Sequence, residues 1–209
     1  MKNVVFVHGW GFDASFWEGI ASEITGCDIQ CVDMGFFGLQ NKTLPDDAIY
    51  ITHSMGLAWT LERANHVEAL VVINGFTKFC ASTDWPDGVA ERMLTRMIRQ
   101  FDRAPEKVWV EFMKNSGLDA PIYPDEADTN GLKTGLEYLL SVDVRQKYQS
   151  LTCPKFILAG GVDTIVTEKL TVASFERDII WYKEAKHLLP LSHSTDCVRH
   201  IQEFLDQLD

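Results

Sequence analysis

Three residues that together can perform nucleophilic catalysis occur along the chain in the order Ser54, Asp163, His187. A serine hydroxyl is a poor nucleophile until a base removes its proton, and a neutral imidazole can be that base. A neighbouring carboxylate selects the imidazole tautomer and stabilises the imidazolium that forms. We therefore predict Ser54 as nucleophile, His187 as base and Asp163 as the acid of a catalytic triad.

Each of these residues follows a stretch that is typical of a buried strand. The apolar, β-branched run 4–7 is typical of a strand buried in a parallel sheet, and we predict further strands over residues 28–32, 48–52, 69–73, 155–159 and 179–182. Ligands bind beyond the carboxyl ends of such strands. Ser54 follows the third predicted strand, Asp163 the fifth and His187 the sixth. We therefore expect an α/β fold of about six mostly parallel strands, with the three side chains at one edge.

The alternation of strands and helices stops between residues 77 and 150. This stretch contains only helical patterns, over residues 89–101, 105–115 and 131–140. Because an all-helical insert between two strands of one sheet is typical of a lid, we expect a helical cap over residues 77–150. The core would then comprise residues 1–76 and 151–209.

Ser54 stands in the pentapeptide Thr52-His53-Ser54-Met55-Gly56, between a predicted strand and a predicted helix. Such a strand-to-helix turn can expose a nucleophile, although an isolated Ser-x-Gly also fits an ordinary loop. The oxyanion of an acyl-transfer reaction needs preset donors. We expect the backbone N–H groups of Met55 and Trp10 to supply them, because the glycines at 9 and 11 let that loop approach closely.

The base and the acid each have rivals in the sequence. His193 lies six residues beyond His187, near the start of the last predicted helix. Asp143 lies in the predicted cap and Asp178 before the last strand. Only His187 directly follows the last strand, and this position favours it as the base. Asp163 is favoured as the acid because it follows the fifth strand, although an aspartate after two glycines also fits a simple turn.

Aromatic residues near the predicted strand ends indicate a pocket. Phe76 follows the fourth predicted strand and Phe112 lies in the predicted cap. We expect both to line an acyl pocket, and His53, beside the nucleophile, to point toward the pocket or the cap. Most of the other aromatic side chains fit a hydrophobic core.

Composition excludes several classes of protein. The chain has 209 residues and a net charge of −11, which would repel nucleic acid. No run approaches the roughly 20 apolar residues of a membrane span. The apolar run near the start of the sequence is too short for the core of a signal peptide. Its five cysteines lack zinc-site spacing. We expect a cytoplasmic, monomeric protein that binds neither metal nor membrane.

Four stretches resemble a known family: VVFVHGWGFDASFW, DWPDGV, GLKTGLEYLLSVDVRQ and AKHLLPLSH. They are similar to the α/β-hydrolase superfamily, in which Ser, Asp and His occur in this order, and within it to the methyl ester esterases of biotin synthesis. The resemblance implies an enzyme that removes the methyl group of pimeloyl-acyl carrier protein without metal or organic cofactor. It assigns Ser54, Asp163 and His187 to the triad, and Trp10 and Met55 to the oxyanion donors.

The chain departs from the family pattern in three ways. The strands that the family places before the HGWG stretch are missing, the connection between Asp33 and Ala48 is short, and Thr52 replaces the first glycine around the nucleophile. Two alternatives therefore stay open. In the first, the chain is another small-ester or C–C bond hydrolase with the same triad. In the second, it is a non-catalytic acyl-binding protein of the same fold.

A row of arginines lies within the predicted helix 89–101 and just after it. Half of the eight arginines of the chain fall on one face at helical spacing: Arg92, Arg96, Arg99 and Arg103. Guanidinium groups suit carboxylates and phosphates, so we expect this row to dock acidic acyl carrier protein. A solvated helix face is the alternative interpretation.

Overall fold

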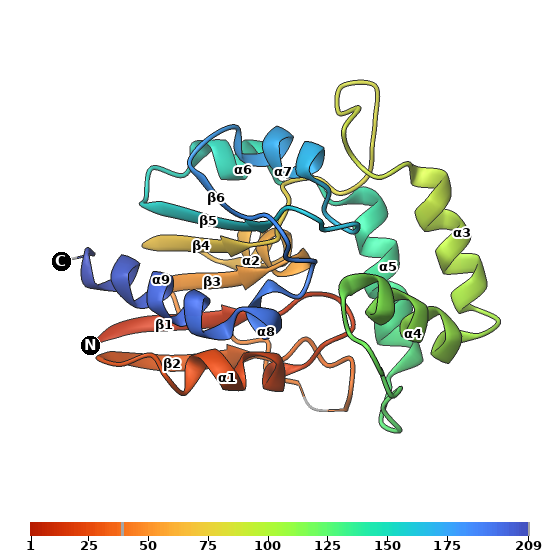
Figure 1. The fold of residues 1–209 in the computed structure, drawn as a ribbon, viewed down its shortest axis with the longest axis horizontal. Coiled ribbons are helices and arrows are strands. Elements are labelled where there is room, and N and C mark those ends of the chain that lie inside the picture. Colours follow the sequence, from red (N-terminus) through yellow and green to blue (C-terminus); the bar gives the residue numbers. More distant parts are fainter. Residues whose placement is uncertain (39, 209) are drawn as a thin grey trace.

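The computed structural model describes residues 1–38 and 40–208, which contain one six-stranded sheet (Figure 1). Its order is β2-β1-β3-β4-β5-β6, and all neighbouring strands are parallel. The strands are β1 (Lys2–Val7), β2 (Cys27–Val32), β3 (Ile49–His53), β4 (Ala69–Ile73), β5 (Lys155–Gly160) and β6 (Ile179–Tyr182). The predicted six-stranded α/β fold is confirmed.

Helices cover both faces of the sheet because its strands are apolar on both sides. In β1, Val4 and Phe6 join one hydrophobic cluster, whereas Val5 and Val7 join the other. The first cluster packs under η1 (Ala14–Trp17), α1 (Glu18–Ala21), α8 (Leu189–Ser192) and α9 (Ser194–Asp206), which lie in front of the sheet in Figure 1. The second packs under α2 (Met55–Arg63) and α7 (Glu168–Phe175).

Four helices lie between β4 and β5 in the chain: α3 (Glu91–Phe101), α4 (Pro105–Ser116), α5 (Thr129–Ser141) and α6 (Arg145–Ser150). Figure 1 shows α3, α4 and α5 beyond the carboxyl ends of the strands. α6 lies apart from them, beside α7, where the rings of Tyr148 and Phe175 are 5.2 Å apart. The division into a core and a cap over 77–150 stays a prediction, and α6 packs on the sheet side.

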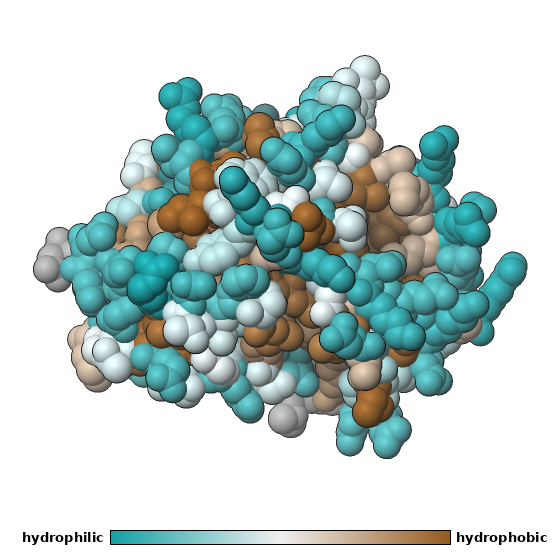
Figure 2. Space-filling model, viewed as in Figure 1, coloured by the Kyte–Doolittle hydropathy of each residue, from teal (hydrophilic) through white to brown (hydrophobic). Residues whose placement is uncertain are grey.

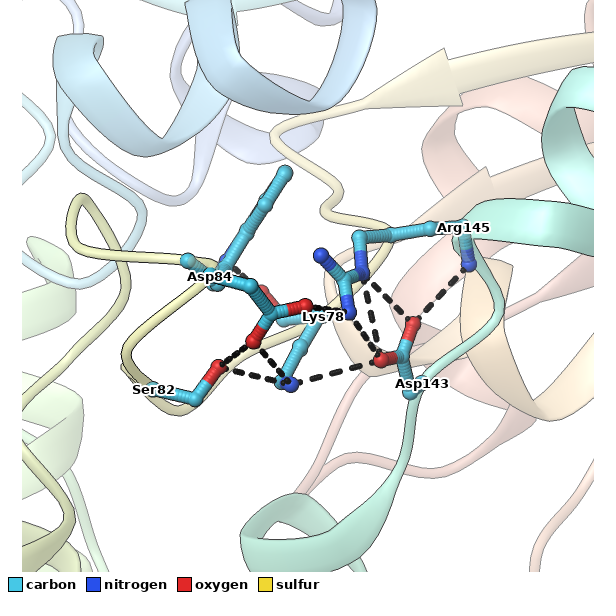
Figure 3. Close-up of polar contacts among 6 residues, drawn as sticks. Lys78, Ser82, Asp84, Asp143 and Arg145 are labelled. Carbon is cyan, nitrogen blue, oxygen red and sulfur yellow. Dashed lines mark hydrogen bonds and ion pairs between the residues drawn. The ribbon is translucent and has the colours of Figure 1, made fainter.

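A polar cluster connects the chain that leaves β4 to the chain that enters α6 (Figure 3). The Arg145 guanidinium binds Asp143 at 2.6 Å and Asp84 at 2.8 Å, and Lys78 reaches Asp143 at 3.3 Å. The hydrogen bond from Arg145 lowers the pKa of the Asp143 carboxyl. The Arg145 guanidinium also lies 5.0 Å from the centre of the Trp85 ring. These contacts hold together two segments that are far apart in the sequence.

Candidate active site

Ser54 occupies a sharp turn between β3 and α2. Its φ of 55° and ψ of −124° are unusual for a residue with a side chain. Gly56 permits this turn, because a Cβ at that position would lie 2.4 Å from the Val7 carbonyl oxygen. The close packing of this turn on the end of β1 therefore requires glycine at position 56.

Thr52, where glycine is usual, is accommodated by its neighbour in the sheet. It is fully buried, and its hydroxyl donates to the Val71 carbonyl oxygen at 3.1 Å. The core thus accommodates the Thr52 methyl group and satisfies its hydroxyl group. Threonine at this position does not prevent the turn at Ser54.

The structure brings Ser54, His187 and Asp163 into one hydrogen-bonded chain. The Ser54 hydroxyl lies 3.0 Å from His187 Nε2, and His187 Nδ1 lies 2.7 Å from Asp163 Oδ2. All three residues are at least nine-tenths buried. Because the carboxylate can only accept, Nδ1 carries the proton and Nε2 is free to accept the proton of the Ser54 hydroxyl. This arrangement suits nucleophilic attack on a carbonyl carbon.

The Asp163 carboxylate is held by four N–H donors. Its Oδ1 accepts from the backbone of Ile165 at 2.7 Å and Val166 at 2.9 Å. Its Oδ2 accepts from His187 and also from the Asn74 side chain, each at 2.7 Å. Asn74 was not among the residues predicted from the sequence, although its position directly after β4 places it at the same sheet edge.

The alternative candidates for the base and the acid lie outside this hydrogen-bonded chain. His193 Nδ1 contacts the Ser192 hydroxyl at 2.9 Å, and its ring packs on Tyr182. Asp143 belongs to the polar cluster with Arg145. Asp178 occupies a turn before β6 with a φ of 63°. The contacts of these three residues do not include Ser54, Asp163 or His187.

The loop after β1 lies directly against the nucleophile. A Cβ at Gly9 would lie 2.9 Å from that of Ser54. The Trp10 indole N–H donates to the Leu132 carbonyl oxygen in α5 at 2.7 Å, which fixes this loop. Met55 is the first residue of α2, where backbone N–H groups have no partner within the helix. The role of the backbone N–H groups of Trp10 and Met55 as oxyanion donors stays a prediction.

Comparisons with known proteins agree with this geometry. No protein-family model matches the chain. A pimeloyl-acyl-carrier-protein methyl ester esterase of Legionella pneumophila (strain Corby) is 27% identical over 228 residues, covering 97% of this chain and 94% of that protein. One of the same name from Citrobacter koseri is 26% identical over 243 residues, covering 99% and 92%.

Solved structures share the fold at lower identity. An esterase from Exiguobacterium antarcticum superposes with a TM-score of 0.86 at 14% identity, covering 99% of this chain and 92% of that one. A bromoperoxidase from Bacillus anthracis gives 0.82 at 16% identity, with the same coverage. The chain has the α/β-hydrolase fold. Its curated relatives and the buried Ser54, His187 and Asp163 make it a carboxylic ester hydrolase.

An apolar cleft of about 500 Å³ lies near the triad of this hydrolase, although Ser54, Asp163 and His187 do not line it. It lies between α3, α4 and the loop after β5, and Figure 2 shows it as a hollow lined by apolar residues. Phe112 lines it, with its ring 6.4 Å from that of His187 and 4.9 Å from that of Trp10. Phe76 does not line the cleft. It packs against the cleft residue Phe79, with the two ring centres 4.9 Å apart.

His53 lies behind the triad of the hydrolase and not at the cleft, where it was predicted from the sequence. It is fully buried, and its Nε2–H donates to the His187 carbonyl oxygen at 3.0 Å. Its ring packs on Phe16 at 4.7 Å and on His187 at 4.8 Å. Burial, followed by the nearby His187, lowers the pKa of His53 well below its ordinary value. His53 therefore supports the base in its neutral form.

The four arginines are exposed side chains of the hydrolase surface. Arg92, Arg96 and Arg99 belong to α3, and Arg103 follows two residues after its end. Their side chains form neither ion pairs nor hydrogen bonds with the part of the chain that the structure describes. On the opposite side of α3, Leu94, Ile98 and Phe101 are buried. The guanidinium groups are therefore available to a partner.

Two absences concern the described part of the hydrolase. Within residues 1–38 and 40–208, no helix combines the length and apolar character that crossing a membrane requires. The same residues contain no group of three or more His, Cys, Asp or Glu side chains arranged to hold a metal ion.

Proposed function

We propose that this hydrolase removes the methyl group of pimeloyl-acyl carrier protein, a step of biotin biosynthesis. The observation that carries the proposal is the hydrogen-bonded chain from Ser54 through His187 to Asp163, which lies beside an apolar cleft. The choice of substrate follows from the names of relatives that align with nearly the whole chain. The cytoplasmic location and the monomeric state stay predictions.

Acylation begins when Ser54 Oγ attacks the carbonyl carbon of the methyl ester while His187 Nε2 takes the hydroxyl proton. The carbonyl oxygen becomes an oxyanion, which the N–H groups of Trp10 and Met55 stabilise. The tetrahedral intermediate collapses as the bond to the methoxy oxygen breaks. The imidazolium returns its proton to that oxygen, methanol leaves, and the acyl group remains on Ser54.

Deacylation repeats these steps with water. His187 takes a proton from a water molecule, whose oxygen attacks the acyl carbon. When the second intermediate collapses, the Ser54 oxygen leaves with the proton from the imidazolium, and the free carboxylic acid is released. Four N–H donors hold the Asp163 carboxylate in place, so that it orients His187 through both halves of the reaction. No step requires a metal or an organic cofactor.

The cleft and the arginines provide places for the two parts of the substrate. The apolar acyl chain suits the cleft walls, to which Phe79, Leu94 and Phe112 contribute. Met93 and Met97 of α3 also line the cleft, so it opens beside the helix that carries three of the arginines. Acidic acyl carrier protein bound to that helix would present its acyl group near the cleft.

A fluorophosphonate probe and two kinds of ester test the proposal. Wild-type protein should be labelled covalently, and Ser54→Ala should not. Methyl pimeloyl-acyl carrier protein should be hydrolysed with a higher kcat/KM than p-nitrophenyl esters of graded chain length, and Ser54→Ala should lose at least about 10⁴-fold in kcat on each. Labelling without hydrolysis of the carrier-bound ester would indicate another ester or C–C bond substrate. Absence of Ser54-dependent labelling would favour an acyl-binding protein.

A further inference from the structure

Asn74 occupies a position that joins the acid and the base of the site. It directly follows β4, is 1% exposed, and has a φ of 48°. Its backbone N–H donates to the Leu158 carbonyl oxygen of β5 at 3.0 Å, so its main chain is anchored to the sheet. Asparagine is one of the few residues with a side chain that adopt this backbone conformation readily.

The Asn74 amide uses both of its N–H bonds on the catalytic segments. Its Nδ2 donates to Asp163 Oδ2 at 2.7 Å and to the Lys186 carbonyl oxygen at 3.1 Å. Lys186 immediately precedes His187, so one side chain holds the acid and the backbone of the base. Within the described residues, the buried Asn74 Oδ1 has no hydrogen-bond partner. The side chain is therefore arranged for donation to these two oxygens, although its own acceptor stays unsatisfied.

Sharing of Asp163 Oδ2 between two donors has an electrostatic consequence. The amide dipole of Asn74 offsets part of the negative charge that His187 Nδ1–H experiences. The titratable groups that face His187 are Asp163, from the loop after β5, and His53, at the end of β3. Burial lowers the pKa of His53 well below its ordinary value, so that ring stays neutral near neutral pH. Within the described residues, Asp163 is therefore the charged group that contacts the base, and Asn74 shares the same carboxylate oxygen.

We propose that Asn74 is a positioning residue that fixes the Asp163 carboxylate and limits the proton affinity of His187. The proposal rests on the proposed Ser-His-Asp mechanism for its kinetic effect, but its effect on the titration of His187 is independent of turnover. A purely structural role for Asn74 would change stability without moving that titration.

The first test is an NMR titration of His187 in the Ser54→Ala background, which needs no catalysis. Asn74→Gly removes the amide and keeps a residue that tolerates positive φ. The matched control is Asn65→Gly, because Asn65 also donates its amide to a carboxylate, Asp46, at 3.1 Å, but on the surface. We expect Asn74→Gly to move the His187 midpoint up by about one pH unit, and Asn65→Gly to leave it in place. An unchanged or lowered midpoint overturns the proposal.

The second test uses hydrolysis of a p-nitrophenyl ester. Asn74→Gly should lower kcat about tenfold, the size expected for one hydrogen bond to a charged group, with KM within about twofold. The acid limb of the pH profile of kcat/KM should move to higher pH. Asn74→Ala also removes the amide, so it should move the acid limb in the same direction if Asn74→Gly does not fold. Uniform loss at all pH values in the variant that folds would contradict the proposal.

These outcomes separate the two hypotheses. If wild-type protein is not labelled by the fluorophosphonate, the proposed function fails, whereas the NMR midpoint still decides the role of Asn74. If labelling and hydrolysis are normal but the midpoint and the acid limb do not respond to Asn74→Gly or Asn74→Ala, only the role of Asn74 fails.

Discussion

The His53 ring lies 4.8 Å from the His187 ring, and its Nε2–H donates to the His187 carbonyl oxygen at 3.0 Å. A neutral, buried histidine thus supports the backbone of the proposed base. Its other ring nitrogen, Nδ1, is buried and has no hydrogen-bond partner within the described residues. Protonation of His53 would place a charge in this apolar environment, and the fold disfavours it.

This placement predicts that stability falls in mild acid. The pKa of His53 is lowered from 6.5 in the folded protein, so below pH 6.5 the unfolded chain binds a proton that the folded protein does not. The contribution is full above pH 6.5 and is lost as the pH falls, by about 1.4 kcal/mol for each unit below 6.5 until the folded form also titrates.

Urea denaturation at pH 7.0 and pH 5.5 measures this loss. His53→Gln keeps an N–H donor for the His187 carbonyl oxygen but cannot titrate, so it should lose about 1 kcal/mol less than wild type between the two pH values. Equal losses in both proteins would show that His53 is not the group responsible.

Gly56 should not tolerate a larger residue. An added Cβ would lie 2.4 Å from the Val7 carbonyl oxygen, and backbone cannot move aside easily. Gly56→Ala should therefore lower the free energy of unfolding by about 3 kcal/mol or more and abolish probe labelling. In contrast, Gly19→Ala, in an exposed helical position with no atom within 4 Å of the new Cβ, should stabilise by about 0.5–1 kcal/mol. Similar effects in a thermal denaturation series would contradict the steric explanation.

Thr52 should contribute to stability and not to catalysis. Thr52→Gly removes a buried methyl group and the hydrogen bond to Val71, so we expect a loss of about 2 kcal/mol in chemical denaturation. The kcat of ester hydrolysis should change less than about threefold. Thr52→Ser, which keeps the hydroxyl, should lose about half as much stability. A large fall in kcat in Thr52→Ser would instead mean that this position shapes the nucleophile turn.

Charge reversal on α3 tests the docking hypothesis. The double variant Arg96→Glu, Arg99→Glu should raise KM for carrier-bound ester about tenfold, because acidic carrier protein would be repelled. Hydrolysis of a p-nitrophenyl ester should not change.

The matched control for this variant is Lys169→Glu, Arg177→Glu, on exposed residues in and after α7. Each substitution changes the charge by −2, so both double variants change the net charge from −11 to −15. If both raise KM equally, net charge and not the arginine row governs association. If neither does, the row is a solvated helix face.

The sheet could be predicted because most of its strands contain short runs of apolar and β-branched residues. The run 69–73, for example, is β4 and is buried throughout. α7 could not be predicted as readily, because Glu168–Phe175 has only a weak amphipathic pattern and its helical state depends on packing over β5. The β-to-helix turn at Ser54 was predictable from the types of residue on each side of it.

The positions of His53 and Asn74 show where the sequence was insufficient or was not fully used. His53 is the last residue of β3, so the two-residue period directs it to the same face as Ile49 and Ile51, toward Phe16. Ending the predicted strand at Thr52 concealed this signal. Asn74 after a strand and before glycine fits an ordinary turn. Asn74 is distinguished from an ordinary turn residue only by the three-dimensional proximity of β4, β5 and the loop before His187.

The ion pairs among Lys78, Asp84, Asp143 and Arg145 have a consequence for how such an enzyme can diversify. The backbone N–H of Val144 also donates to the Thr77 carbonyl oxygen at 2.8 Å. The segment that leaves β4 and the segment that enters α6 therefore lie side by side. We infer that everything between these points is a single continuous insert, tied at its base. An exchange of that insert by recombination would alter which esters are accepted, while the residues that break the bond stay on the retained scaffold.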